Sequence, residues 1–208
     1  MGVKDEPVGA FLEAVAAPTP TSGGGSVSAF AGALGAALTR MVASLARGKK
    51  GYETVESDLL AIESNARTVQ ARLLDLVEED SRAYGAVVAA MKLPKATETE
   101  RTARVEAMQA AYKEATRVPL ETMAACAQVL DLAAESLEKG HRGAVTDAAV
   151  AILLAEAGLR GASLNARINL SSIRDDAFRT ATEAEMNRIL RHADEVGHRA
   201  MAQAEGRI

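Results

Sequence analysis

Residues 54–91 read TVESDLLAIESNARTVQARLLDLVEEDSRAYGAVVAAM, and this stretch decides the fold. Apolar side chains recur at alternating intervals of three and four residues, which places them along one face of an α-helix. In heptad terms the a positions are Val55, Ile62, Val69, Leu76 and Ala83, and the d positions are Leu59, Ala66, Leu73, Asp80 and Val87. The pattern predicts one long helix that packs against other helices along this seam.

One member of this seam carries a charge. Asp80 occupies a d position between Leu73 and Val87. Either the helix has begun to leave the core at this turn and residues 79–82 are solvated, or a carboxylate faces the interior, where it needs polar partners. Tyr84 lies one turn further along nearly the same face, where it can hydrogen-bond the carboxylate or a ligand beside it. The pattern leaves both interpretations open.

The remaining sequence is also helical in character. Its 208 residues are 48% apolar, with three Phe, three Tyr and no Trp, and residues 1–208 are expected to form a single domain. Further helices are expected over residues 5–16, 26–46, 97–140, 147–173 and 176–203, with Pro119 kinking or restarting the third of these. Asp5, Ser26, Thr97 and Thr146 are the expected N-caps. The sequence predicts an all-α bundle of about six to seven helices, several of them long.

A glycine-rich turn precedes the second of these helices. It contains Ser22, Gly23, Gly24, Gly25 and Ser26. Consecutive glycines let several backbone N–H groups converge, and the helix behind them adds the positive end of its dipole. The turn is therefore a candidate site for a carboxylate, a phosphate or an electron-rich ring edge, although such a turn is more often only a tight connection.

Other polar residues stand out by their positions on the predicted helices. Lys49 and Lys50 follow a helix C-terminus, where basic side chains usually complement the dipole, and Asp147 lies in a first turn, where a carboxylate does the same. Asn165 and Asn169 are four residues apart, so both amides point the same way. These amides either satisfy neighbouring backbone groups or line a polar ligand site between helices.

Composition argues against several classes of function. The net charge of −4 comes from acidic and basic residues mixed along the chain, which gives no basic stripe for nucleic acid. Arg40 and several hydroxyl residues interrupt the apolar run 27–46, so no membrane span is expected. The single Cys126 favours a cytoplasmic location, and His141, His192 and His198 lack metal-ligand spacing, so no metal is expected.

Six short motifs in order resemble one family, the cyclodeaminase/cyclohydrolase family, which includes the cyclodeaminase part of formiminotransferase-cyclodeaminase and stand-alone bacterial methenyltetrahydrofolate cyclohydrolases. The resemblance covers residues 11–190. The motifs are Ser22-Gly23-Gly24-Gly25-Ser26-Val27, Gly48-Lys49-Lys50-x-Tyr52, Asp80-x-x-x-Tyr84, Leu93-Pro94-Lys95, Val118-Pro119-Leu120 and Leu164-Asn165-x-x-Ile168-Asn169-Leu170. The resemblance implies an all-α homodimer that dimerises through helices and acts on a reduced folate.

The sequence departs from the family pattern in one place. The run Gly140-His141-Arg142-Gly143-Ala144-Val145-Thr146-Asp147 lacks the Asn-rich residues usual before the Ser-Asp pair. Thr146-Asp147 keeps a hydroxyl and a carboxylate, whereas contacts assigned to the preceding residues do not carry over.

The resemblance also implies a chemistry. A methenyltetrahydrofolate cyclohydrolase adds water to a cationic carbon bridge, so Asp80 is the expected base and negative group, and Tyr84 is expected to orient it or relay a proton. Asp147, Asn165 and Asn169 are candidates for the folate ring, while Lys49, Lys50 or the glycine-rich helix start would hold the anionic tail. No cofactor is required. The alternatives are formiminotetrahydrofolate cyclodeaminase, which releases ammonia, and a non-catalytic helical folate-binding or interaction module.

Overall fold

The structure is a computed structural model that describes residues 7–18 and 22–208 of the chain. These residues form only helices and connections, which confirms the all-α prediction. The helices are α1 (Val8–Ala16), α2 (Gly24–Ala46), α3 (Glu56–Met91), α4 (Glu98–Lys139), α5 (Val145–Leu170) and α6 (Asp176–Glu205), with short 3-10 turns at Glu53–Val55 and Arg142–Ala144.

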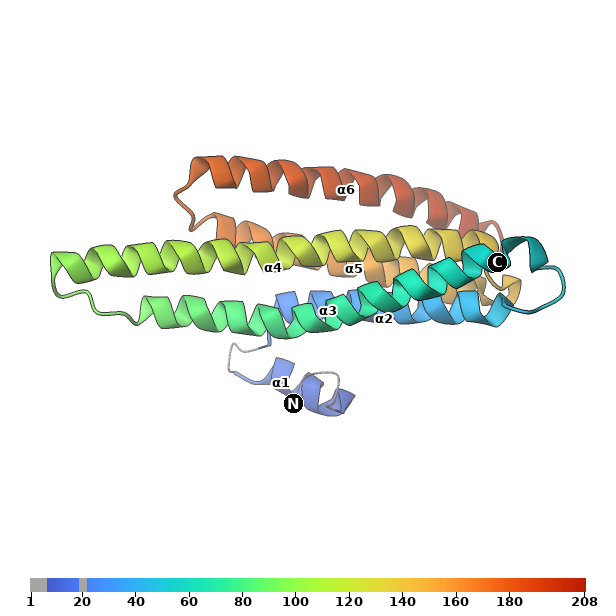
Figure 1. The fold of residues 1–208 in the computed structure, drawn as a ribbon, viewed down its shortest axis with the longest axis horizontal. Helices are drawn as coiled ribbons and strands as arrows, with labels where there is room; N and C mark the ends of the chain where they lie inside the picture. Colours follow the sequence, from blue (N-terminus) through green and yellow to red (C-terminus); the bar gives the residue numbers. More distant parts are fainter. Residues whose placement is uncertain (1–6, 19–21) are drawn as a thin grey trace.

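The bundle is elongated, and its long helices lie along a common axis (Figure 1). Helix α2 packs against α3 and α5, and α4 completes the central group by packing against α3 and α5. Helix α6 covers α4 and α5 on one side, and α1 projects from the opposite side of the bundle (Figure 1). The four central helices therefore enclose the core.

The heptad seam of α3 lies in that core, as its spacing predicts. All of its apolar members from Leu59 to Val87 are buried. The first member, Val55, belongs to the preceding 3-10 turn rather than to α3. Burial continues past Asp80, because both Ala83 and Val87 are buried, so the helix has not left the core at that turn.

Small residues let α2 approach its neighbours closely. A Cβ atom added to Gly32 would lie 2.5 Å from the sulfur of Cys126, and one added to Gly35 would lie 2.9 Å from the carbonyl oxygen of Ala151. The small-residue face of α2 that includes Gly32 and Gly35 therefore packs inside the bundle. Burial raises the pKa of the Cys126 thiol to about 12, so this cysteine is an inert core residue.

The helix ends follow the predicted signals at some places and not at others. Thr97 forms the predicted capping box with Glu100, and Gly48 stops α2 with a left-handed φ of 65°. Thr146 is not a cap, because α5 begins at Val145 after Ala144, which makes no side-chain cap. The predicted cap Asp5 lies outside the described residues.

Two further predictions on helix boundaries have outcomes that bear on the site. Ser26 does not cap α2, because the helix already begins at Gly24 and Ser26 lies within its first turn. Pro119 does not restart its helix, since α4 continues through it without interruption. The positions of both residues affect hydrogen bonds at the candidate site, which are described below.

Within the described ranges, α2 is the one helix long and apolar enough to cross a membrane, and half of its most apolar window is buried in the bundle. A core helix of a folded domain has the same character.

Candidate active site

A pocket lies where α2 begins. Helix α2 starts at Gly24, beside Asp80, whereas α3 continues eleven residues further to Met91. Helices α4 and α5 also extend past this level, so the space that more turns of α2 would occupy is left open. The resulting cavity has a volume of about 390 Å³ and is lined by Gly23, Gly24, Gly25, Asp80, Ala83, Tyr84, Val87, Met91, Tyr112, Ala115, Asn165, Ile168, Asn169, Ser171 and Ser172.

Asp80 meets the first turn of α2. The hydroxyl of Ser26 donates to the Asp80 Oδ2 atom over 2.9 Å, and the backbone N–H of Ser26 also hydrogen-bonds this carboxylate. The carbonyl oxygen of Val77 lies 3.1 Å from the same hydroxyl. Because N–H groups in a first helical turn lack partners within their own helix, Asp80 supplies from α3 the cap that α2 does not provide for itself.

Gly25 makes this contact possible. A Cβ atom at residue 25 would lie 2.1 Å from Oδ1 of Asp80 and 2.5 Å from its Cγ, far inside contact distance. Burial raises the pKa of the Asp80 carboxyl above its ordinary value, and the hydrogen bonds from Ser26 partly oppose this rise. The carboxylate is thus partly desolvated, held by two donors, and open to the cavity.

Pro119 determines how Asn169 is oriented. A proline has no N–H, so the carbonyl of Ala115, four residues before it in α4, loses its helical partner. The side-chain nitrogen of Asn169 donates to that carbonyl over 2.6 Å. Asn165 is also oriented by a backbone carbonyl, in this case one in its own helix. Its side-chain nitrogen donates over 2.9 Å to the carbonyl of Gly161, four residues earlier in α5. Each amide has one donor engaged, and its carbonyl oxygen makes no bond within the described chain.

Tyr84 lines the same cavity and is exposed over 44% of its surface. No hydrogen bond joins it to Asp80 in the part of the chain that the structure describes. Sequence reasoning missed Tyr112, Ser171 and Ser172 as pocket residues. Tyr112 follows the helical spacing of core residues, and the two serines follow a helix end, so no pattern distinguished them.

The structure does not bring all the predicted site residues together in the folded chain. Gly23, Gly24, Gly25, Ser26, Asp80, Tyr84, Asn165 and Asn169 meet at the pocket, and Ser22 directly precedes its glycines. Lys49 and Lys50 follow the other end of α2, which lies about 35 Å away at 1.5 Å per residue. Asp147 also lies at that far end, in the first turn of α5.

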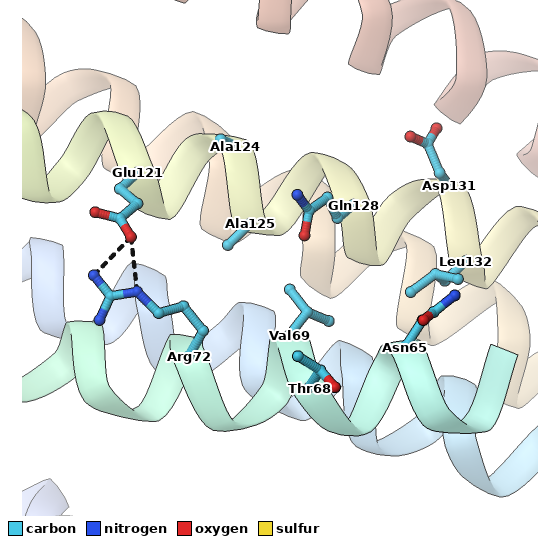
Figure 2. Close-up of a pocket in the computed structure, with 10 residues that line it drawn as sticks. All are labelled: Asn65, Thr68, Val69, Arg72, Glu121, Ala124, Ala125, Gln128, Asp131 and Leu132. Atoms are coloured by element: carbon cyan, nitrogen blue, oxygen red, sulfur yellow. Dashed lines mark hydrogen bonds and ion pairs between the residues drawn. The ribbon is translucent and has the colours of Figure 1, made fainter. Parts of the chain in front are cut away.

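A larger groove, of about 630 Å³, lies between α3 and α4 (Figure 2). None of the site residues predicted from the sequence lines it. Arg72 turns along the groove toward Glu121, to which its Nε donates over 2.7 Å (Figure 2). Arg72 also bonds Glu79. The carboxylate of Asp131 points away from the groove, toward His192 on α6. The charged groups that line the groove are thus all paired with other protein side chains, which makes the smaller pocket the better candidate.

Metal-ligating groups do not gather at either cavity. Among the residues with described positions, no three His, Cys, Asp or Glu side chains are placed to hold one metal ion.

The fold and the pocket together define the class: an all-helical protein in which one half-buried carboxylate, two phenols and two amides line a ligand-sized cavity. Residues 7–188 match the family model described as formiminotransferase-cyclodeaminase. The chain belongs to this family.

Three relatives illustrate the breadth of the family. A protein of Methylorubrum extorquens named methenyltetrahydrofolate cyclohydrolase is 38% identical over 98% of both chains. Formimidoyltransferase-cyclodeaminase of Gallus gallus is 36% identical over 99% of this chain and 38% of its own length. The crystal structure of formiminotetrahydrofolate cyclodeaminase from Thermotoga maritima matches with a TM-score of 0.90 and 30% identity over 98% of both chains.

Proposed function

We propose that this protein is a methenyltetrahydrofolate cyclohydrolase, which converts 5,10-methenyltetrahydrofolate and water to 10-formyltetrahydrofolate. The observation that carries the proposal is the partly desolvated carboxylate of Asp80 at the open start of α2. The full-length similarity to the Methylorubrum extorquens cyclohydrolase supports it.

The substrate carries a delocalised cation over N5, the bridging carbon and N10. A carboxylate in a site with little water stabilises that cation more strongly than it does in bulk solvent. Asp80 takes a proton from the attacking water as the new carbon–oxygen bond forms. The carbon–N5 bond then breaks, N5 gains a proton and the adduct hydroxyl loses one, so a single proton is released overall. Tyr84 lies one turn from Asp80 and either orients its carboxylate or relays a proton.

The two asparagines suit the ring of a folate. Each already uses a donor on a backbone carbonyl and presents its oxygen as an acceptor. The aminopyrimidinone edge carries neighbouring N–H donors that match a pair of acceptors. Water is the only reactant besides the folate, so the proposal includes no cofactor.

The first test is the decay of the near-ultraviolet absorbance of methenyltetrahydrofolate, with and without the protein, in a buffer that keeps spontaneous hydrolysis slow. Acceleration proportional to protein concentration supports the cyclohydrolase. The second candidate is formiminotetrahydrofolate cyclodeaminase, favoured by the close match to the Thermotoga maritima structure. Ammonia release from formiminotetrahydrofolate identifies that activity, whereas binding without either turnover identifies a non-catalytic module.

The reaction should show a shifted dependence on pH. Asp80 acts as a base only when ionised, and burial raises the pKa of its carboxyl, so the rate should fall on acidification at a higher pH than an exposed aspartate would give. Ser26→Ala removes a hydrogen bond that lowers this pKa and should move the acidic limb of the kcat/KM profile, which reports the free enzyme, to still higher pH. An acidic limb that does not move between wild type and Ser26→Ala contradicts the assignment.

We also propose that two copies of the chain pair through α2 and α5. An apolar heptad seam lies on the outer side of each helix, formed by Val27, Ala31, Leu34, Leu38, Met41 and Leu45 on α2 and by Val150, Leu154, Ala157, Gly161, Leu164 and Ile168 on α5. Every member of the two seams is exposed or half-buried, and the exposed fraction reaches 67% at Ile168. Such a surface fits a second pair of helices.

Charges along the margins of this seam surface turn away from it. Arg40 bonds Gln70 on α3 over 2.6 Å, and Arg160 bonds Asp194 on α6. The two helices also run antiparallel, because Gly24 lies beside Asn165 while Gly35 lies beside Ala151. A self-complementary face of this kind is typical of a two-fold dimer.

Leu34→Glu should convert the dimer to a monomer, because it places a charge in the middle of the apolar seams. Leu60→Glu is the matched control, since Leu60 is exposed to a similar extent on α3, outside the seams. Light scattering coupled to gel filtration measures the mass of each variant. The proposed interface is wrong if Leu34→Glu remains dimeric, and vesicle binding by a monomeric wild type would assign the seams to lipid.

A further inference from the structure

We infer that Pro119 is a positioning residue for substrate recognition, because it leaves the buried carbonyl of Ala115 free to fix the side chain of Asn169 at the pocket. The proline does not line the pocket itself, so it acts only through the asparagine. The inference rests on the proposed function and adds to it a residue that sets which hydrogen-bonding atom the ligand meets.

Pro119 lies near the middle of α4, a position where a proline is costly. Its ring removes an N–H group and crowds the carbonyl four residues earlier. Helix α4 nevertheless continues from Glu98 to Lys139. On either side of the proline, the hydroxyls of Thr116 and Thr122 donate to the carbonyls four residues before them, over 2.8 and 3.1 Å. Such bonds bend a helix slightly, so the turns around Pro119 are shaped to accommodate it.

The carbonyl that Pro119 frees requires another donor. Ala115 is buried, with 7% of its surface exposed, and a buried carbonyl without a donor is destabilising. The side-chain nitrogen of Asn169 supplies that donor across the interface between α4 and α5, over 2.6 Å. Ala115 and Asn169 both line the pocket. The missing N–H of one helix is thus coupled to a polar side chain of the site.

This bond determines which atom of the amide meets a ligand. The oxygen and the nitrogen of an amide are similar in size, so hydrogen bonding alone distinguishes the two orientations. With its nitrogen bound, Asn169 offers its oxygen, and Asn165 does the same. Together with Asp80, they give the pocket three acceptor side chains. An N–H at residue 119 would compete for the carbonyl and release the Asn169 amide to turn its N–H groups toward those of a substrate, which weakens binding.

A double-mutant cycle tests the coupling. Pro119→Ala restores an N–H to α4 and should raise KM about 10-fold, as expected for one lost hydrogen bond, with little change in kcat. Asn169→Ala should raise KM by a similar factor. The double variant should be no worse than either single variant, because the same interaction is already lost. The inference is wrong if the two factors multiply in the double variant, or if Pro119→Ala keeps the KM of the wild type.

Asn165 provides the matched control. Its amide is held by the carbonyl of Gly161 in its own helix, so its orientation does not depend on Pro119. The effects of Asn165→Ala and Pro119→Ala on KM should therefore multiply when the two substitutions are combined. Equal non-additivity in both cycles would mean that Pro119 acts through the overall shape of the pocket, which overturns its assignment to Asn169.

Two measurements need no turnover and so separate this inference from the proposed function. Calorimetric titration with 5-formyltetrahydrofolate, a stable reduced folate, should show the same non-additivity in Kd, and a protein that binds in this way without hydrolysis overturns only the proposed function. Chemical denaturation should show that Asn169→Ala lowers the midpoint in the presence of Pro119 but not in the Pro119→Ala background, where α4 supplies the donor. Coupling in stability without coupling in KM or Kd leaves Pro119 a structural role and overturns the inference.

Discussion

Asp80→Asn should lower kcat for methenyltetrahydrofolate hydrolysis by about 10³-fold. The amide cannot accept a proton from water and carries no charge to stabilise the cationic bridge. KM should rise as well, because the bound substrate loses the carboxylate that faces its cationic bridge, although the asparagines and the walls of the pocket still bind the ring. Steady-state kinetics with the absorbance assay gives both constants.

The protein itself should tolerate this substitution. The amide oxygen of Asn still accepts the hydrogen bonds from Ser26, and the cost of desolvating a carboxylate disappears. The melting temperature should therefore equal or exceed that of the wild type. Glu78→Gln, two residues away on α3, is the matched control and should retain full activity. A folded Asp80→Asn protein that keeps most of its turnover removes Asp80 from the chemistry.

Gly25→Ala should lower kcat/KM by about 10²-fold, since small displacements of a catalytic group are costly. The added methyl would lie 2.1 Å from Oδ1 of Asp80, so the carboxylate or the start of α2 must move. Because both are fixed by the hydrogen bonds from Ser26, the displacement should also reduce the free energy of unfolding by ~1–3 kcal/mol.

Gly85→Ala separates this steric effect from the general effect of losing a glycine. Gly85 lies next to Tyr84 on α3, and an added Cβ would meet nothing within 4 Å. This variant should keep its activity and gain up to ~1 kcal/mol of stability, because alanine favours the helical backbone. Chemical denaturation and the same kinetic assay measure both effects. Equal activities for Gly25→Ala and Gly85→Ala would show that the approach of Asp80 to α2 is unimportant.

The sequence predicts the seams better than it predicts the ends of the helices. The heptads of α3 identify the buried face correctly, and the charged d position at Asp80 marks the pocket, because a carboxylate in an apolar seam requires partners. The N-cap at Ser26 is wrong because the capping carboxylate comes from residue 80, and such long-range partners leave no local pattern. Likewise, the continuity of α4 through Pro119 depends on its packing in the bundle, which outweighs the local preference for a break.

The separation of Lys49 and Asp80 shows another limit. A motif states which residues serve one function but not how far apart one folded chain holds them. Asn169 illustrates the same point on a smaller scale, since its orientation depends on a carbonyl freed by a proline in another helix.

The start of α2 part-way along the bundle has a consequence for how this protein can evolve. A cavity made by shortening core side chains usually costs about 24 cal/mol per Å³, because the surrounding atoms lose contacts. Here the space arises from the unequal lengths of neighbouring helices, and the packed layers below Gly24 remain complete. Substitutions of pocket residues that neither cap α2 nor pair the freed carbonyl of Ala115, such as Tyr84, can therefore alter ligand preference with little loss of folding free energy, so new specificities are accessible without compensating changes in the core.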